Sequence, residues 1–371
     1  MPIPMPSSPF RISDADRLLL IRLGAVGDVL RTLPALHLIR TAFPAVHVAW
    51  VAEEVSLELL AGHPEIDELI PFPRRRLISM ARRPSRLAAA LYELGRDLRG
   101  RRFTVAVDFQ GSLKSGMIAL LSGAPRRVGF APGHCREMSF LFTNHWVRPR
   151  SRWLNRVERN LLLSEALGAT GDDVIMLLPE TTQEGRRAEE TARQLAPGGE
   201  PLVLLAPGTS RRQAYKRWPL VRYSRLAARL ASELGVVPAV TWGPGEEEMA
   251  RAVVRDSDGA ARLAPPLGLR SLAALLRRAA LFVGADTGPM HLAWGVGCPV
   301  IAIFGPTDPR LNGPLGRGHA VLRGGSSAAA VSADEAFGAA RAVLGRAPRT
   351  PRIETKWSRA TLFTAAAGPP P

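Results

Sequence analysis

The sequence contains few cysteines, no long apolar run and no short motif typical of a metal site. Its two cysteines, Cys135 and Cys298, lie far apart among 371 residues, which excludes a disulfide framework or a zinc-binding spacing. No HExxH or CxxC pattern occurs, so we expect no metal site. No apolar run approaches the roughly 20 residues that cross a bilayer, and the N-terminus lacks the basic-then-apolar order of a signal peptide. These absences predict a protein of the reducing cytosol.

Lysine is also scarce, although the chain carries a formal net charge of +16. It occurs only as Lys114, Lys216 and Lys356, so nearly all the positive charge is arginine. A bias throughout the chain is most simply a coding-composition effect, but a basic surface also favours nucleic acid, an anionic lipid surface or an acidic glycolipid. The densest cluster comprises Arg74, Arg75, Arg76, Arg82, Arg83 and Arg86. It lacks interleaved aromatic residues that would stack on bases, which argues against nucleic acid.

Length and hydrophobic patterning predict two α/β domains. A chain of 371 residues exceeds one ordinary core. Short apolar runs typical of buried parallel strands lie at 17–22, 46–51, 66–71, 103–109, 127–130, 201–206, 236–242, 281–283 and 300–304. Helical segments are expected near 29–43, 55–62, 112–122, 153–167, 219–234, 245–255, 270–278 and 333–344, and toward the end of the basic segment 74–100. The alternation predicts open parallel sheets, and residues 131–150 read as a loop that lines a site.

These patterns also set the expected domain boundaries. We expect a loose N-terminal arm at 1–16 and a first Rossmann-like domain at 17–175. A second Rossmann-like domain is expected at 176–325, followed by a tail at 326–371 that is partly helical with a disordered end.

The segment after the apolar run at 281–283 predicts an anion site. Asp286, Thr287 and Gly288 follow the strand, and Pro289 suits the first position of a helix. Free N–H groups at such a helix start bind anions such as a diphosphate, and His291, one turn further, can donate to the same anion. As alternatives, Asp286 or Thr287 is a helix N-cap and His291 is a core histidine.

A second candidate turn, Gly24-Ala-Val-Gly27-Asp28, follows the first strand. Its glycines allow a sharp turn and leave room for a ligand, whereas Asp28 can equally be an N-cap. Glu53 and Glu54 end the second strand about where a ribose-binding acid of a dinucleotide site lies. The G-x-x-G-D spacing, however, lacks the G-x-G-x-x-G pattern of such a site.

Three further stretches combine strand ends with polar residues. Thr209 and Ser210 can hydrogen-bond a phosphate, and Lys216 can stabilise the charge of a departing diphosphate, unless this is only a solvated basic loop. Glu246 and Glu247, after Trp242-Gly243, suit ribose hydroxyls or an acidic helix start. The remaining stretch, Asp108-Phe-Gln110-Gly-Ser-Leu-Lys114, reads as an acceptor contact or a plain polar turn.

Taken together, these motifs resemble glycosyltransferase family 9, the ADP-heptose:lipopolysaccharide heptosyltransferases. The resemblance rests on R-L-G-A-V-G-D, on P-G-T-S followed by K-R-W-P, and on D-T-G-P-M-H-L followed by F-G-P-T-D-P, and it spans roughly residues 17–320. It implies a GT-B fold, in which two Rossmann-like α/β domains flank a cleft. It also implies inverting transfer of heptose from ADP-L-glycero-D-manno-heptose to the inner core of lipopolysaccharide, without a cofactor.

The resemblance also implies roles for individual residues. Asp28 is the general base, and Lys216, Thr209 and the helix start at Thr287 and Gly288 hold the leaving diphosphate. The other implied donor residues are Ser210, Glu246, Glu247, Asp286 and His291. The acceptor candidates are Gln110, Lys114, Arg74 and Arg75. The expected acceptor is an acidic glycolipid, Kdo-lipid A or a heptosylated core, met by a monomer at the cytoplasmic face of the inner membrane, with no nucleic acid involved.

Other functions remain open at this stage. The same fold can use another nucleotide sugar. Glu53 and Glu54 suggest an NAD(P)-dependent oxidoreductase, and the charge suggests a non-catalytic protein that binds polyanions.

Overall fold

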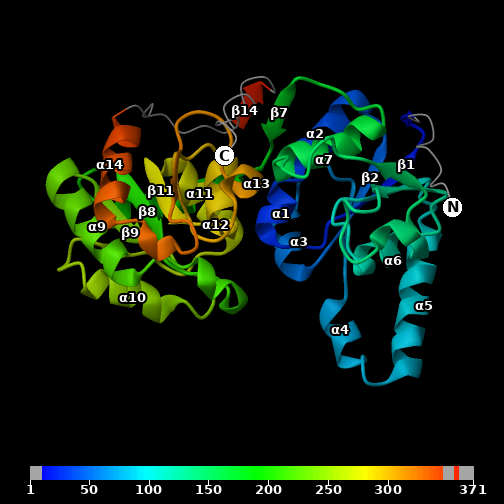
Figure 1. The fold of residues 1–371 in the computed structure, drawn as a ribbon, viewed down its shortest axis with the longest axis horizontal. Helices are drawn as coiled ribbons and strands as arrows, with labels where there is room; N and C mark the ends of the chain where they lie inside the picture. The colour runs from blue at the N-terminus through cyan, green and yellow to red at the C-terminus, as the bar shows by residue number, and fades with distance from the viewer. Residues whose placement is uncertain (1–10, 346–354, 359–371) are drawn as a thin grey trace. The chain divides into compact units, whose positions relative to one another are not determined.

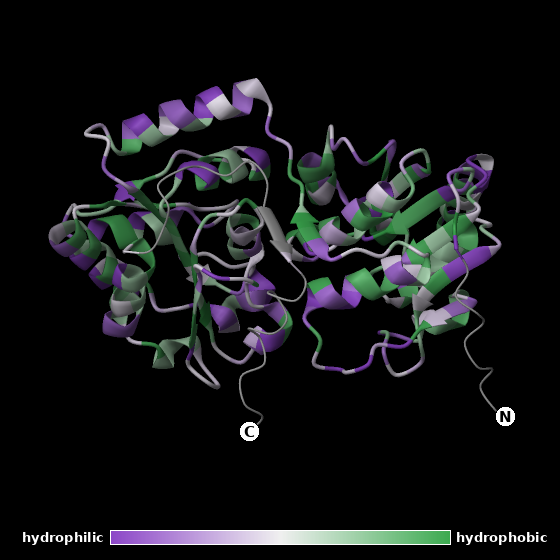
Figure 2. Ribbon diagram, turned by 90° about the horizontal axis from the view of Figure 1, so that it is seen from above, coloured by the Kyte–Doolittle hydropathy of each residue, from purple (hydrophilic) through white to green (hydrophobic). Residues whose placement is uncertain are grey.

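The computed structural model describes residues 11–345 and 355–358, and it divides into two compact units, Met1–Val174 and Ile175–Pro371. Each unit is built on one six-stranded sheet, and all the strand pairs in both sheets are parallel (Figure 1). The central strands are hydrophobic and the outer helices alternate between hydrophobic and polar residues (Figure 2). This is the pattern of a sheet that is covered on both faces.

The first unit has the strand order β3-β2-β1-β4-β5-β6. Its strands are β1 (Arg17–Ile21), β2 (His47–Ala52), β3 (Glu68–Pro71), β4 (Val105–Asp108), β5 (Arg126–Phe130) and β6 (His145–Val147). Its helices are α1 (Val26–Leu30), α2 (Leu33–Ala42), α3 (Glu54–Leu60), α4 (Arg74–Ser79), α5 (Pro84–Gly100), α6 (Leu113–Leu121), the 3-10 helix η1 (Ser139–Phe142) and α7 (Arg156–Ala166). The strand order reverses between β1 and β4, and ligands bind at the carboxyl ends of strands at such a point.

The second unit repeats this topology, with the order β10-β9-β8-β11-β12-β13. Its strands are β8 (Leu202–Ala206), β9 (Val237–Val240), β10 (Arg262–Leu263), β11 (Leu281–Ala285), β12 (Val300–Phe304) and β13 (Ala320–Arg323). Its helices are α8 (Thr182–Leu195), η2 (Arg211–Lys216), α9 (Leu220–Leu234), α10 (Glu247–Arg255), α11 (Leu269–Arg278), α12 (Gly288–Gly295), α13 (Pro309–Asn312), η3 (Ala328–Ala330) and α14 (Ala333–Leu344). Strands β7 (Asp173–Met176) and β14 (Thr355–Ser358) form a separate two-stranded sheet.

The long apolar runs became strands as predicted, but several short elements were missed. The predicted loop at 131–150 contains η1 and the edge strand β6, whose three residues are too few to show an alternating pattern. Helices α4 and α8 and strand β10 were not predicted either. The predicted helix at 29–43 is two helices, α1 and α2, separated at Arg31 and Thr32.

The two ends of the described chain are more firmly packed than the sequence indicated. Ile12, in the expected loose arm, is 3% exposed, and its N–H donates to the Leu167 carbonyl. Helix α14 belongs to the core of the second unit rather than to a separate tail, since Phe337 and Ala340 pack into the same apolar cluster as β8 and β11. The expected disordered C-terminal end lies outside the described residues.

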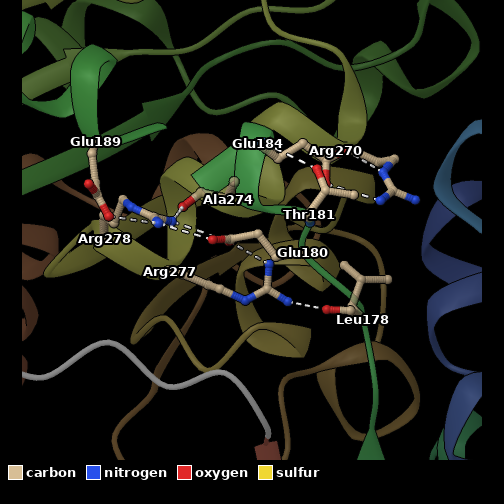
Figure 3. A network of polar contacts seen from close by, with 9 residues as sticks. All are labelled: Leu178, Glu180, Thr181, Glu184, Glu189, Arg270, Ala274, Arg277 and Arg278. Atoms are coloured by element: carbon tan, nitrogen blue, oxygen red, sulfur yellow. Dashed lines mark hydrogen bonds and ion pairs between the residues drawn. The ribbon is translucent and has the colours of Figure 1, made fainter. Parts of the chain in front are cut away.

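Helix α8 is polar, and ion pairs attach it to α11 (Figure 3). Arg270 contacts Glu184 of α8 at 2.5 Å, and Arg278 contacts Glu189 of α8 at 3.3 Å. Arg278 also contacts Glu180, just before the helix, at 3.0 Å. The hydrogen bond from Arg270 lowers the pKa of Glu184 to about 2, so this carboxylate stays ionised at neutral pH. These ion pairs add to the packing of α8, whose Ala188 and Leu195 are buried.

Candidate active site

In the second unit, three of the predicted site residues form one buried charged cluster. Lys216, at the end of η2, donates from Nζ to Asp286 Oδ2 at 2.8 Å and to the Asp286 carbonyl at 3.1 Å. His291 Nε2, on α12, lies 3.3 Å from Asp286 Oδ1. The side chains of Lys216, Asp286 and His291 are 9%, 4% and 4% exposed. Residues 70 positions apart in sequence therefore meet at the carboxyl end of β11.

Electrostatics keep Asp286 ionised within this cluster. Burial opposes ionisation, but His291 and Lys216 outweigh it and hold the pKa of Asp286 well below its usual range. Asp286 therefore fixes the position of the Lys216 ammonium group, and it partly compensates the charge of Lys216.

The start of α12 is not capped in the ordinary way. Thr287 occupies the N-cap position but accepts no hydrogen bond there, and its hydroxyl donates to the Ala285 carbonyl at 3.3 Å. Gly288 then opens the helix without a side chain of its own. This arrangement favours an anion at the helix start over the capping alternative.

The loop after β8 lies beside a second polar group. Thr209 is 4% exposed, and Arg217 donates to its hydroxyl at 3.0 Å and to its carbonyl at 3.1 Å. Ser210 is exposed at the N-cap of η2. Arg217 thus orders the loop, whereas Lys216 points to Asp286.

The structure distinguishes the two candidate glutamates. Glu246 Oε2 accepts the Gly243 N–H at 3.0 Å, and its carboxylate lies so close to Gly208 that a Cβ atom there would be 2.1 Å from Oε2. Glu247 instead pairs with Arg251 at 2.6 Å on the outside of α10. Only Glu246 therefore approaches the loop that carries Thr209.

The first unit contains a polar cavity of about 660 Å³, and Asp28 lies in its wall. The Asp28 side chain is 30% exposed, and its Oδ1 is held by Arg22 at 2.9 Å and by Arg31 at 2.6 Å. Both arginines were overlooked in the sequence, although each lies within six residues of Asp28. They orient its carboxylate toward the cavity.

Two of the four acceptor candidates line this cavity. Gln110 is held by the Leu23 N–H at 2.9 Å, and Lys114 pairs with Glu53 at 2.8 Å. Glu53 also pairs with Arg74 at 2.9 Å, so it connects two of the acceptor candidates. Arg74 lines a neighbouring groove instead.

Arg75 is the acceptor candidate that the structure leaves apart. Its side chain is 87% exposed, it lies 3.5 Å from Glu54, and it lines neither cavity.

The same cavity contains a group of arginines that the sequence analysis missed. Arg136, Arg156 and Arg159 lie in its wall, and none of them has an ion-pair partner in the part of the chain that the structure describes. Burial, with the charges of Arg156, Arg136 and Arg22, lowers the pKa of Arg159 to about 10. Such crowding indicates a site for an anionic ligand. The available signal was the spacing of Arg156 and Arg159, one turn apart where α7 begins.

Asp108 shapes the turn that carries Gln110. Its Oδ1 accepts the N–H groups of Gln110 at 3.0 Å and Gly111 at 2.8 Å, and Gly111 has the positive φ of +67° that favours glycine. Its Oδ2 has no hydrogen-bond partner among the described residues. Burial raises the pKa of Asp108 to about 6.

Two doubly wound units, each with polar residues at the carboxyl ends of its central strands, form the arrangement of the GT-B fold. The comparisons with known proteins identify the family. The model of "Glycosyltransferase family 9 (heptosyltransferase)" matches residues 91–338. Lipopolysaccharide heptosyltransferase 1 of Pseudomonas aeruginosa is 32% identical, over 82% of this chain and 83% of its own. The chain belongs to glycosyltransferase family 9.

Solved structures agree with this assignment. The chain is similar to the E. coli heptosyltransferase WaaC with ADP, with a TM-score of 0.71 and 26% identity over 88% of this chain and 99% of that one. The same enzyme with ADP-2-deoxy-2-fluoro heptose gives a TM-score of 0.70 at the same identity and coverage. The predicted GT-B fold and family resemblance are confirmed, and the protein is a heptosyltransferase-family enzyme rather than an oxidoreductase or a non-catalytic binder.

The buried Asp108 carboxylate leads to a prediction about stability and pH. Because folding raises the pKa of Asp108 from 3.8 to about 6, protonation of this carboxyl stabilises the folded state. That contribution is complete below pH 3.8 and is lost as the pH rises through 6. Asp108→Asn keeps the oxygen acceptor without the charge, so it should stabilise the protein at pH 8 by about 1–3 kcal/mol and do so less at pH 5. Chemical denaturation at both pH values checks this. The exposed Asp172→Asn is the control, and an Asp108→Asn protein less stable than wild type at pH 8 would refute the account.

Proposed function

We propose that this enzyme transfers heptose from ADP-L-glycero-D-manno-heptose to the inner core of lipopolysaccharide, with inversion at the anomeric carbon. The observation that carries the proposal is the buried Lys216–Asp286–His291 cluster beside an uncapped helix start. Family membership supports it, as do the relative named for lipopolysaccharide and the solved relative that holds an ADP-heptose analogue.

The donor is proposed to bind the second unit. N–H groups of α12 at Thr287 and Gly288 point to where a diphosphate would receive hydrogen bonds. Lys216 and the Thr209–Ser210 loop contact the leaving group, and charge on the departing ADP is stabilised by these fixed groups. Asp286 and His291 orient the donor and hold Lys216 in place. Glu246, beside Gly208, is the glutamate proposed to accept from ribose hydroxyls.

The acceptor is proposed to bind the cavity of the first unit. Asp28 takes the proton of the acceptor hydroxyl. At the same time the hydroxyl oxygen of the acceptor bonds to the anomeric carbon, and the bond from that carbon to ADP breaks. Arg22 and Arg31 position the carboxylate. The arginine group formed by Arg136, Arg156 and Arg159 suits the acid groups of a Kdo-lipid A or heptosylated-core acceptor.

The same proposal covers organisation and location. Residues 17–175 would form the acceptor domain and 176–325 the donor domain of a monomer that works at the cytoplasmic face of the inner membrane. Within residues 11–345 and 355–358, no helix is long and apolar enough to cross a membrane.

Asp28→Asn tests the base. The amide keeps the shape of the side chain but cannot take a proton, so kcat for transfer should fall by about 10²–10⁴ while ADP affinity stays unchanged. Steady-state release of ADP from ADP-heptose, with a purified acceptor, measures this. Glu58→Gln, an exposed acid of the same unit, is the control. Full turnover by Asp28→Asn would remove Asp28 from the proposed mechanism.

Arg156→Gln and Arg159→Gln test the acceptor site. Each removes one charge-assisted contact to an anionic acceptor, so the KM for acceptor should rise by about 10- to 100-fold while the KM for ADP-heptose changes little. Arg187→Gln on α8 is the matched control, because it removes an exposed arginine from the other unit. A rise in the KM for the donor instead would mean that the arginine group does not select the acceptor.

A further inference from the structure

Helix α4 lies on the surface of the first unit and leaves one of its two apolar side chains uncovered. None of its six residues is buried, and Ile78 is 62% exposed. A short turn joins α4 to α5, and Figure 1 shows this helical pair at the edge of the first unit. We name residues 74–100 the α4–α5 hairpin. Leu77 packs partly against the core of the first unit, whereas Ile78 remains exposed to meet another surface.

An apolar groove of about 400 Å³ lies between the hairpin and α6. Its walls include Leu77, Ile78, Leu91, Leu94, Met117 and Leu121. Other exposed apolar side chains lie on the same helices: Tyr92 is 66% exposed, Leu113 44% and Leu120 45%. The groove therefore lies on helices that expose further apolar side chains, and exposed apolar groups gathered in this way mark an interaction site.

The first half of the hairpin, residues 74–86, is strongly basic. Six arginines lie between Arg74 and Arg86, and the sequence between them contains no acid. The exposed Arg82, Arg83 and Arg86 have no ion-pair partner within the described residues. Apolar side chains beside clustered arginines are typical of segments that lie on anionic bilayers.

The groove adjoins the polar cavity of the same unit. Lys114 and Glu137 line both spaces, so the acceptor site and the groove share a wall. A molecule with an acidic sugar in the cavity and an apolar tail would have its tail at the groove.

From the apolar walls, the unpaired arginines and this shared wall, we infer that the α4–α5 hairpin docks on an anionic lipid bilayer, with an acyl chain of an anionic lipid in the groove. The inference rests on the proposed function, in which the acceptor is a glycolipid, and it adds the surface that meets the membrane. A protein partner is less favoured, because residues 74–86 contain no acidic residue that could pair with the basic groups of a protein surface.

The test is sedimentation of the full chain with vesicles. The probes are vesicles of phosphatidylcholine alone and vesicles that also contain phosphatidylglycerol. We expect the protein to bind the anionic vesicles, less strongly as salt is raised, and to bind the neutral vesicles weakly.

Two variants address the two parts of the surface. Ile78→Asp places a charge at the groove, and Arg82→Ser/Arg83→Ser/Arg86→Ser removes three unpaired cations. Each should weaken binding to anionic vesicles by about tenfold or more. Matched controls are Val221→Ser, an exposed apolar residue of α9, and Arg186→Ser/Arg187→Ser/Arg193→Ser on α8, which removes the same charge from the other unit. Thermal unfolding and ADP affinity confirm that all variants fold.

The inference would be overturned if the wild type did not bind anionic vesicles, or if the hairpin variants bound them as strongly as the wild type. It would also be overturned if the wild type self-associated and Ile78→Asp abolished that self-association. Vesicle binding needs no turnover, so it is separable from the proposed function. If the enzyme transfers heptose to a deacylated, water-soluble acceptor but the hairpin variants bind vesicles like wild type, only this inference fails. If vesicle binding behaves as expected and no transfer occurs, the proposed function fails instead.

Discussion

The contact on which the second unit's site depends is the buried ion pair between Lys216 and Asp286. Two charged groups that are less than a tenth exposed are costly to remove from water, and neither would be tolerated there alone. The pair joins η2 to the end of β11, and His291 extends it to α12. A departing diphosphate can therefore meet a lysine that is already in place, instead of one that must be ordered during the reaction.

In the first unit, arginine side chains likewise hold a charged group in place. Arg22 and Arg31 hold Asp28 from two sides, and both sites lie where the strand order of a parallel sheet reverses. The two sites differ in their charge balance. Lys216 is compensated by Asp286. Among the described residues the arginine group of the first unit's cavity makes no ion pair, and we attribute this difference to an acceptor that brings several negative charges.

The sequence predicted the parts of this structure that are continuous in the chain. Parallel strands such as β8 and β12 are unbroken apolar runs, and Asp286 to His291 follow directly after such a run. Features that depend on distant residues were not predictable in this way. Glu246 accepts the Gly243 N–H and approaches Gly208, which has no side chain to exclude its carboxylate, whereas Glu247 pairs with Arg251. The cavity arginines meet only after α7 has packed on the sheet. Helix α8 was missed because most of its residues are polar and only Gly185, Ala188 and Leu195 are buried, which leaves a weak apolar pattern in the sequence.

The central claim is that the cluster around Asp286 forms the site for an adenine nucleotide diphosphate, and isothermal titration calorimetry with ADP, GDP, UDP and NAD tests it most directly. The account predicts that ADP binds more tightly than the other three, and that Asp286→Asn, which releases Lys216, weakens ADP binding by about tenfold or more while Glu247→Gln does not. A preference for UDP or GDP would contradict the donor assignment, and unchanged ADP affinity in Asp286→Asn would contradict the role given to the buried ion pair.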